Sequence, residues 1–350
     1  MPDLVVLRPE GLYCPPGDFF IDPWRPVARA VVTHAHGDHA SRGHGSYLAA
    51  ADAANVMRAR LGEIALTTLP YGEPLRHNDV VVSLHPAGHV LGSAQVRIEH
   101  RGEVWVVSGD YFVAGDRDDP REYDPTCAPF ESVRCHCFVT ESTFGLPIYR
   151  WAPQAEVFAG IDGWWRGNAD AGRASVLFGY ALGKAQRILR GVDPAIGPIV
   201  VHGAVDAINR AYRASGVALP PTQLVTEIAD PALLRRCLVL APPSAQRSPW
   251  LRRFGDLGDA FASGWMQIRG TRRRRAVDRG FVLSDHADWP GLLAAVDATG
   301  CERVVITHGD DAVLGRVLAE RGLEVDTFRT AYGDAAEASA SVSPSADERP

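Results

Sequence analysis

Four side chains able to bind a metal ion follow one another closely in the run Thr33-His34-Ala35-His36-Gly37-Asp38-His39. Imidazole and carboxylate groups are the ligands that borderline divalent ions prefer. The alternate spacing lets His34 and His36 reach one ion while Asp38 and His39 face a second. A solvated histidine-rich loop is the alternative interpretation, and it is the weaker one because ligands are so dense in this run.

Two metal ions need more ligands than this run supplies. Three further candidates each follow a predicted strand or the turn after it: His89, Asp110 and His308. Taken alone, either histidine would more often be a hydrogen-bonded core or surface residue. Their shared position at strand ends predicts that they join the first four in one cluster.

The elements expected to position this cluster are short strands in the N-terminal part of the chain. Apolar runs bounded by turn residues predict them at Val5–Leu7, Ala30–Thr33, Val80–Leu84, Ala94–Glu99, Val104–Ser108 and Cys137–Thr140. One helix is predicted among them, Ala49–Leu61, which is rich in alanine and ends before Gly62. This part of the chain is therefore expected to be strand-rich.

From about Tyr149 the pattern changes to helices that alternate with single strands. The predicted helices are Gln154–Arg166, Gly183–Leu189 and Ala204–Ser215, and the strands are Ser175–Gly179, Ile199–His202 and Cys237–Ala241. This alternation predicts a parallel sheet. Strands at Gly280–Ser284 and Arg303–Thr307 each lead into a histidine-bearing turn and a helix, so the first domain is expected to resume there.

Length and composition bound the class of protein. The chain has 350 residues, of which 46% are hydrophobic and 22% charged, which excludes a wholly disordered, collagen-like or coiled-coil chain. No apolar run approaches a membrane span, and the N-terminus has no signal-peptide pattern, so we expect a cytoplasmic protein without membrane association. The formal charge of −6 argues against indiscriminate coating of nucleic acid but allows a local basic groove.

Six scattered cysteines form no paired C-x-x-C elements and are expected to be reduced thiols. The run Cys135-His136-Cys137 is disfavoured as a metal site, because in a strand the two cysteines would share a face and His136 would point away. The small polar segment 334–350 is expected to be a disordered tail, with a functional tail peptide as the alternative.

The motif H-x-H-x-D-H at His34 to His39 resembles that of the metallo-β-lactamase-fold hydrolases and, within them, the β-CASP nucleases. Three further segments resemble the β-CASP motifs in order, through Glu141, His286 and His308. The runs Phe20-Ile21-Asp22-Pro23-Trp24 and Gly183-Lys184-Ala185-Gln186-Arg187 are similar to those of the bacterial ligase-associated DNA exonucleases. The resemblance spans nearly the whole chain.

The resemblance implies an α/β (α+β) fold with a four-layer αββα metallo-β-lactamase domain, formed by residues 1–148 and 277–333. Residues 149–276 would be inserted as an α/β β-CASP cap. Residues from both sides of the insertion would then meet at one cleft between the lobes.

The resemblance also implies a role for each site residue. His34, His36 and His89 would bind the first ion, Asp38, His39 and His308 the second, and Asp110 would bridge the two. Zn²⁺ suits the histidine-rich set, and Mn²⁺ remains open. His286 is expected to protonate the leaving group with Glu141 orienting it, and Asp38 is also counted among the catalytic residues.

Alternatives stay open for the remaining candidates. Asp22 would either orient the histidine motif or cap the turn at Pro23, and Asp288 is expected to cap the helix that starts at Trp289. Lys184, the only lysine in the chain, would bind a phosphate with Tyr180, or its helix would merely pack on a sheet. A basic run would track a nucleic-acid backbone or form a solvated face: Arg272, Arg273, Arg274 and Arg275.

The sequence thus predicts a two-metal hydrolase that cleaves phosphodiester bonds. The favoured function is a DNA exonuclease in repair or end processing, with a DNA ligase as a possible partner. An RNA-processing nuclease is the alternative, because a histidine in the third motif, as at His308, is typical of RNA-processing β-CASP members. An inactive nucleic-acid-binding scaffold and a small-molecule hydrolase are less favoured, since every expected ligand and motif is present.

Overall fold

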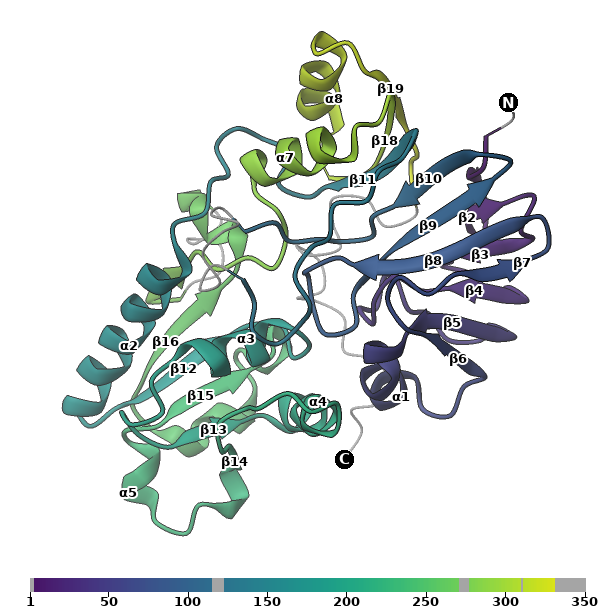
Figure 1. Cartoon of the computed structure of the whole chain (residues 1–350). Helices are drawn as coiled ribbons and strands as arrows, with labels where there is room; N and C mark the ends of the chain where they lie inside the picture. The colour runs from purple at the N-terminus through teal and green to yellow at the C-terminus, as the bar shows by residue number, and fades with distance from the viewer. Residues whose placement is uncertain (1–2, 115–122, 271–276, 310, 331–350) are drawn as a thin grey trace. The chain divides into compact units, whose positions relative to one another are not determined.

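The computed structural model describes residues 3–114, 123–270, 277–309 and 311–330 (Figure 1). These residues divide into two compact units, with unit 1 ending at Arg150 and resuming at His286, and unit 2 running from Trp151 to Asp285. The predicted arginine track, residues 272–275, and the predicted tail, residues 334–350, lie outside the described residues.

Unit 1 contains two sheets. The first, sheet A, has the strand order β1-β2-β3-β4-β5-β6, with bounds Val6–Arg8, Gly11–Cys14, Phe19–Ile21, Arg29–Val31, Ser46–Ala50 and Leu66–Leu69. The second, sheet B, has the order β19-β18-β11-β10-β9-β8-β7, with bounds Glu324–Thr327, Arg303–Gly309, Cys137–Ser142, Glu103–Val107, Ala94–His100, Val80–Pro86 and Leu75–His77. Four neighbouring strands of this sheet, β10, β11, β18 and β19, are mutually parallel.

The two faces of sheet B are both buried because successive side chains point to opposite sides. In β10, Trp105 and Val107 pack toward sheet A, while Val104 and Val106 pack on the other side. That second side is covered by α7 (Trp289–Thr299) and α8 (Asp311–Glu320), which lie beside β18 and β11 in Figure 1. Unit 1 is therefore built as sheet A on sheet B, with sheet B under these two helices.

The helix predicted at Ala49–Leu61 is only partly present. Its first residues form the end of β5 and a single 3₁₀ turn, Ala51–Ala53, and the α-helix α1 spans Ala54–Leu61. Ala50 is buried in the core between the sheets, so tertiary packing overrides the helix propensity of the alanines. By contrast, Asp288 does cap α7, because its side chain accepts a hydrogen bond from the Gly291 amide.

Unit 2 is a single parallel sheet, sheet C, with the order β14-β13-β15-β12-β16-β17 and bounds Gln223–Leu224, Ile199–Val201, Leu238–Ala241, Ala174–Phe178, Leu257–Ala262 and Arg279–Phe281. The α-helices whose full bounds lie in the described part of unit 2 are α2 (Gln154–Asp170), α3 (Lys184–Gly191), α4 (Gly203–Ala214) and the single turn α5 (Pro231–Leu234). Ile161 and Trp165 of α2 pack with α3 on one face of the sheet. Both units therefore mix helices and sheets, and the predicted α/β fold class is confirmed.

The boundary between the units differs from the predicted one. The sequence analysis placed residues 277–333 with the first domain, whereas unit 2 continues to Asp285. The reason is β17, which pairs in parallel with β16 and so completes sheet C.

The residues Cys135 and Cys137 do not share a face, contrary to the prediction. Cys135 lies just before β11 and packs among the residues under α7 and α8, while Cys137 packs between sheets A and B. Burial raises the pKa of the Cys135 thiol to about 12, which keeps it protonated and a poor metal ligand.

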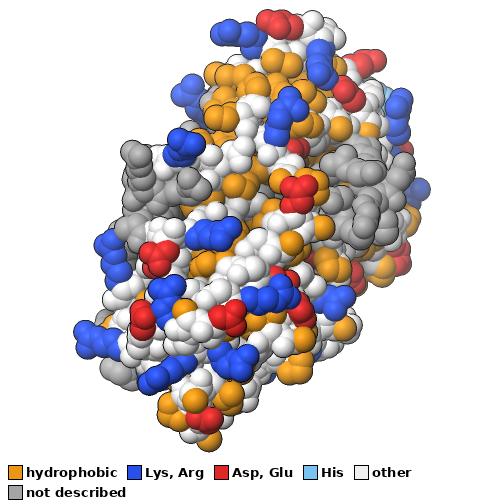
Figure 2. Space-filling model, turned by 90° about the vertical axis from the view of Figure 1, so that its left-hand side faces the viewer, with side chains coloured by type: hydrophobic (Ala, Val, Ile, Leu, Met, Phe, Trp, Pro, Cys, Tyr) orange, Lys and Arg blue, Asp and Glu red, His pale blue; other side chains and the backbone are white. Residues whose placement is uncertain are grey.

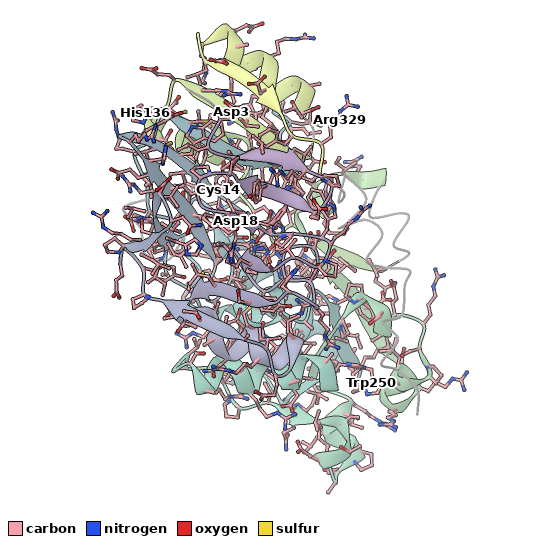
Figure 3. The ribbon with its side chains drawn as sticks, turned by 90° about the vertical axis from the view of Figure 1, so that its right-hand side faces the viewer. Asp3, Cys14, Asp18, His136, Trp250 and Arg329 are labelled. Carbon is pink, nitrogen blue, oxygen red and sulfur yellow. The ribbon has the colours of Figure 1, made fainter. Side chains whose placement is uncertain are left out.

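The surface carries charges of both signs. In the view of Figure 2 the Lys and Arg side chains are interspersed with Asp and Glu side chains. Near the N-terminus, Asp3 (labelled in Figure 3) pairs with Arg303 of β18, which also pairs with Asp326 of β19. These ion pairs tie the segment around Asp3 to both strands. Within the described ranges, no helix combines the length and the apolar character needed to cross a membrane.

A buried polar network surrounds the start of α3. Lys184 is 2% exposed, and its ammonium group lies 2.8 Å from the Asp285 carboxylate. Arg187 donates to the Ser284 carbonyl oxygen and, at 2.9 Å, to Gln154 Oε1. The network fixes the end of unit 2, because buried charged side chains of α3 bind residues 284 and 285.

We expect Lys184→Ala to destabilise the protein by about 3–5 kcal/mol, because it leaves the Asp285 carboxylate buried without its cation. Urea unfolding at neutral pH measures this loss. Arg190→Ala, at an exposed position of the same helix, is the control and should change stability little. A loss below about 1 kcal/mol for Lys184→Ala, as at a surface ion pair, would contradict this account.

Candidate metal and catalytic site

The candidate ligands of unit 1 come from strand ends that meet at one edge of sheet B. The strands β8, β10, β11 and β18 all run in one direction, because β8 and β10 flank the antiparallel β9 and the other two are parallel to β10. His89, Asp110 and His308 lie at the carboxyl ends of three of them. The histidine motif follows β4 of sheet A, whose end is tied to β9 by the hydrogen bond from the Ala94 amide to the Thr33 carbonyl.

The first group of donors surrounds a single point. His36 Nδ1 lies 3.1 Å from His34 Nε2 and 3.0 Å from His89 Nε2, and Asp110 Oδ2 lies 3.5 Å from His34 Nε2. One ligand atom from each of the four residues lies within 4.8 Å of all the others. His34 and His89 are fully buried, so four donor atoms crowd together with little access to water.

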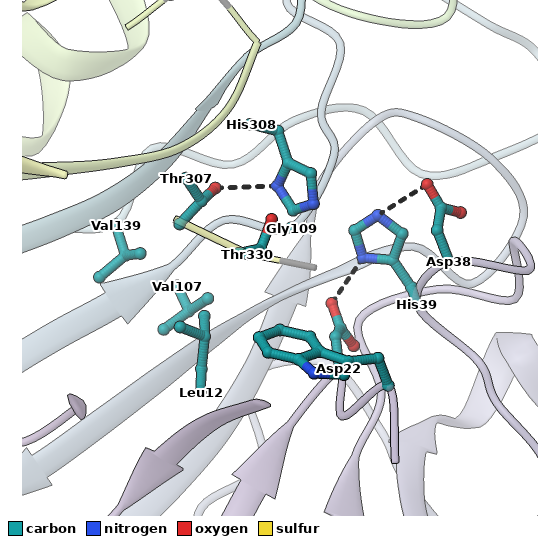
Figure 4. A pocket seen from close by; sticks show the side chains of 11 residues that line it. Leu12, Asp22, Asp38, His39, Val107, Gly109, Val139, Thr307, His308 and Thr330 are labelled. Atoms are coloured by element: carbon teal, nitrogen blue, oxygen red, sulfur yellow. Dashed lines mark hydrogen bonds and ion pairs between the residues drawn. The ribbon is translucent and has the colours of Figure 1, made fainter. Parts of the chain in front are cut away.

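The second group adjoins the first through Asp110. His39 Nε2 lies 3.3 Å from Asp110 Oδ2 and 3.8 Å from Asp38 Oδ2. The His308 ring faces the His39 ring with 5.5 Å between their centroids, and both line the pocket drawn in Figure 4. Asp110 therefore belongs to both groups, as a bridging ligand would.

Asp22 supports the second group from behind. Its Oδ2 lies 2.7 Å from His39 Nδ1 (Figure 4), and its two oxygens accept hydrogen bonds from the Thr33 amide and hydroxyl. Asp22 adopts a φ of 44°, in the left-handed region that aspartate tolerates better than most residues. The contact to His39 agrees with the orienting interpretation of Asp22, and it leaves His39 Nε2 directed at the other donors.

Glycine is required where Asp110 approaches this support. Gly109 has a φ of 57°, and a Cβ atom there would lie 2.6 Å from the Thr33 hydroxyl oxygen. Any side chain would therefore press on the residue that holds Asp22.

The charges of the site are mutually dependent. Burial acts to lower the pKa of His39, but the carboxylates of Asp110, Asp38 and Asp22 hold it well above its usual range. Burial acts to raise the pKa of Asp110, and His39, together with His286 and His34, outweighs it and holds that pKa well below its usual range. Burial, aided by the positive charge of His39, lowers the pKa of His34, so its ring stays neutral as a metal ligand must be.

Glu141 and His286 form a buried pair next to Asp110. His286 Nδ1 lies 2.9 Å from Glu141 Oε2, and Glu141 also accepts a hydrogen bond from the Tyr111 amide at 2.8 Å and one from the Thr143 hydroxyl. The sequence analysis considered Glu141 as a surface carboxylate beside a turn, but it lies inside β11 and is 1% exposed. Ligand atoms of Asp110, Glu141 and His286 lie within 4.8 Å of one another.

A bulge positions His308. The pairing of β11 with β18 shifts register between Thr140 and Ser142, so β18 has an extra residue there. The Thr307 hydroxyl donates to the Thr140 carbonyl oxygen, and the Ser142 hydroxyl donates to the His308 carbonyl oxygen. Gly309, with a φ of 88°, allows the bulge, since a Cβ atom would lie 2.0 Å from the Ser142 carbonyl oxygen.

The site residues predicted from the histidine motif, the strand ends and the Glu141–His286 pair all lie together in unit 1. Lys184 and Tyr180 belong to unit 2, where Lys184 is paired with Asp285, so a phosphate would have to compete with that carboxylate. Their predicted phosphate contact stays a prediction. Sequence reasoning missed the supporting hydroxyls of Thr33 and Thr143, which only their places beside Asp22 and Glu141 indicate.

The residues present fit a pair of divalent ions. His39 Nε2 is buried and has no hydrogen-bond partner among the described residues, although three carboxylates surround that ring. In the first group, nitrogens of His34 and His89 lie at hydrogen-bond distance from His36 Nδ1, and Asp110 Oδ2 lies 3.5 Å and 3.8 Å from the first two. A cation satisfies such an arrangement better than shared protons do.

Comparison with known proteins bears on the family, although no family model matches the chain. Over 319 residues the chain is 35% identical to a protein named "Probable DNA ligase" from Opitutus terrae. The matched region is 90% of this chain and 30% of that protein. Over 130 residues it is 32% identical to "Endoribonuclease ysh1" from Emericella nidulans, and this match covers 35% of this chain and 14% of that protein. The chain is 30% identical over 128 residues to "Endoribonuclease YSH1" from Yarrowia lipolytica, and this match covers 37% of this chain and 14% of that protein.

The chain spans less than a third of the length of these curated relatives. Together with the motifs, the similarities support a family of the metallo-β-lactamase and β-CASP type. A crystal structure of a protein of unknown function from Enterococcus faecalis V583 shares the fold at a TM-score of 0.59 and 11% identity, over 86% of this chain and 79% of that chain.

We expect Asp22→Asn to weaken metal binding by about 10- to 100-fold, because the variant loses the carboxylate that orients His39. Competition titration with a chromophoric zinc chelator measures the affinity. The control is Asp18→Asn, since Asp18, labelled in Figure 3, is an exposed aspartate at the other end of β3 that pairs with Arg29. Equal affinities for both variants and the wild type would show that Asp22 only shapes its turn.

Proposed function

We propose that this chain is a two-metal-dependent nuclease of the β-CASP type, acting as an exonuclease on DNA. The observation that carries the proposal is the sharing of Asp110: its carboxylate adjoins both donor groups and the Glu141–His286 pair. A site with two adjoining cation positions and a neighbouring proton donor suits hydrolysis of a phosphodiester.

In this proposal the first ion is held by His34, His36 and His89, and the second by Asp38, His39 and His308, with Asp110 between them. When bound, the two ions would supply Lewis-acid activation of a water and neutralise the charge of the phosphodiester. The histidine-rich donor set supports Zn²⁺, and the carboxylates leave Mn²⁺ as a competitor.

The protein's own acid is His286. Glu141 contacts Nδ1 of its ring, which orients the ring and would stabilise the imidazolium that has to form before a proton is donated. Nε2 of that imidazolium would then give its proton to the oxygen of the leaving nucleotide. Glu141 is itself fixed by the Tyr111 amide and the Thr143 hydroxyl, so the pair is set in place before substrate binds.

For the fold, we propose that unit 1 is a four-layer αββα metallo-β-lactamase domain and that residues 149–276, most of unit 2, are a β-CASP cap. The support is the return of the chain to sheet B after unit 2, where β18 pairs with β11. The insertion thus lies between two strands that are neighbours in one sheet.

DNA is the favoured substrate because the similarity to the ligase-named protein covers nine-tenths of this chain. The same relative supports a DNA ligase as partner, since there the similar region is part of the larger protein. RNA is the second candidate. It is favoured by His308 in the third motif and by the endoribonuclease-named relatives, whose similarity covers about a third of this chain.

The deciding experiment is cleavage of one end-labelled strand prepared as DNA and as RNA of matched sequence, with added Zn²⁺ or Mn²⁺. We expect stepwise shortening of the DNA from one end and its complete loss in Asp110→Ala, which removes the shared carboxylate. Preferential cleavage of the RNA would move the protein to the RNA-processing alternative. Cleavage by Asp110→Ala at the wild-type rate would exclude the two-metal site.

The role of His286 has a separate test. His286→Ala should lower the cleavage rate by about 10²- to 10⁴-fold while both metal ions stay bound, because the variant loses an acid and not a ligand. Metal content is measured by mass spectrometry on the same samples as the rate. The control is His100→Ala, because His100 lies at the end of β9 that is farther from the histidine motif. A loss of metal from His286→Ala would make His286 a ligand instead.

A further inference from the structure

One large apolar side chain is exposed in the segment that follows Glu141 along the chain. Ile148 is 57% exposed, more than the other exposed large hydrophobic residues of the described chain, Leu7 at 38% and Leu233 at 40%. Single exposed hydrophobic residues are common on protein surfaces, so exposure alone indicates nothing. The position of Ile148, seven residues after Glu141, is what calls for an explanation.

The turn that carries Ile148 is rigidly built. The Tyr149 amide donates to the Leu146 carbonyl at 3.0 Å, which closes a tight turn with Pro147 and Ile148 at its tip. Tyr149 itself is buried at 3% exposure, and its carbonyl accepts a hydrogen bond from the Trp289 amide at 3.1 Å. Tyr149, which follows the tip, is therefore fixed, and the isoleucine beside it is exposed to solvent.

The same turn is connected to the Glu141–His286 pair. The Phe144 ring packs on Tyr149, with centroids 4.8 Å apart, and lies 6.0 Å from the His286 ring in an edge-to-face arrangement. The Gly145 amide donates to the Ser142 carbonyl at 2.9 Å, directly after β11 ends. Ile148 thus keeps a fixed position relative to the proposed proton donor, within unit 1.

We propose that Ile148 is the contact for a nucleobase of the bound strand, next to the scissile phosphate. The inference rests on the proposed nuclease function. An unstacked base near a strand end exposes an apolar ring face, and burying it against an exposed aliphatic side chain removes both surfaces from water. Arg150, exposed two residues further on, supplies positive charge for the strand's phosphates.

The apolar contact makes a prediction that depends on the base and not on the phosphate. The wild type should cleave a single-stranded oligonucleotide with normal terminal bases faster than the same strand with abasic residues at its last two positions. In Ile148→Ser the rate on the normal strand should fall about tenfold, to the abasic level, because the buried apolar area is lost. Its rate on the abasic strand should equal that of the wild type.

Two variants control the experiment. Leu7→Ser removes another exposed hydrophobic residue of unit 1, on β1, and should keep the preference for normal bases. Ile148→Phe should retain or increase it, since an aromatic ring stacks on a base. The abasic residues are placed at the 5′ end in one pair of strands and at the 3′ end in another, so either direction of cleavage is tested.

The outcomes separate this inference from the proposed function. Retention of the full base preference by Ile148→Ser overturns the contact, and so does an equal loss on normal and abasic strands, which would mean that the turn acts on the catalytic pair. If the wild type cleaves neither strand, the nuclease proposal fails. Fluorescence anisotropy then decides the contact: a base-dependent affinity that disappears in Ile148→Ser supports it, and equal affinities reject it.

Discussion

The crowding of buried ionisable groups around the Asp110 carboxylate is the constraint on which the rest of unit 1 depends. Histidine rings approach it from three directions, and one of them, His39, carries a strongly raised pKa because Asp22 and Asp38 add to the field. Such a cluster costs free energy in a folded chain unless charges compensate one another. The surrounding sheets must therefore be stable enough to hold it before any ion is present.

The architecture meets part of that requirement by delivering three of the ligands from strand ends, while the histidine motif lies in the connection between β4 and β5. The strands β8, β10, β11 and β18 share a direction, so their carboxyl ends deliver His89, Asp110 and His308 to one edge while their other residues fill two cores. Gly109 and Gly309 let the backbone come close enough for the side chains to meet. Positions on strands are held more precisely than positions on loops, which favours a preorganised site.

The sequence allowed much of this to be predicted, and the misses have identifiable causes. The histidine motif and the strand-end positions of Asp110 and His308 are local signals, and the structure brings those residues together. Ala49–Leu61 was predicted as one helix because alanine favours helix locally, yet Ala50 ends strand β5 and is buried in the core between the sheets. The pairing of β17 with β16 is a long-range event that no local pattern records, and it moves the end of unit 2.

The burial of Lys184 is a second effect that the sequence hides. A lone lysine at a helix start looked like a phosphate ligand, because its partner Asp285 lies far along the chain and only the folded unit brings the two together. The roles of Thr33 and Thr143 were hidden in the same way, since a threonine beside a catalytic motif has no distinctive spacing. Which side chains support a ligand or an acid depends on tertiary geometry. Which side chains can bind a metal at all depends on residue type, and that can be read from the sequence.

The placement of unit 2 within the chain also sets the order in which the site is made. A ribosome synthesises His34, His36, His89 and Asp110 early, whereas His286 and His308 emerge only after all of unit 2. Strand β18 can pair with β11 only after all of Trp151–Asp285 has been synthesised. A nascent or truncated chain that ends within unit 2 carries the first donor group without the proposed proton donor, so the chain must be synthesised through β18 before the full set of site residues can assemble.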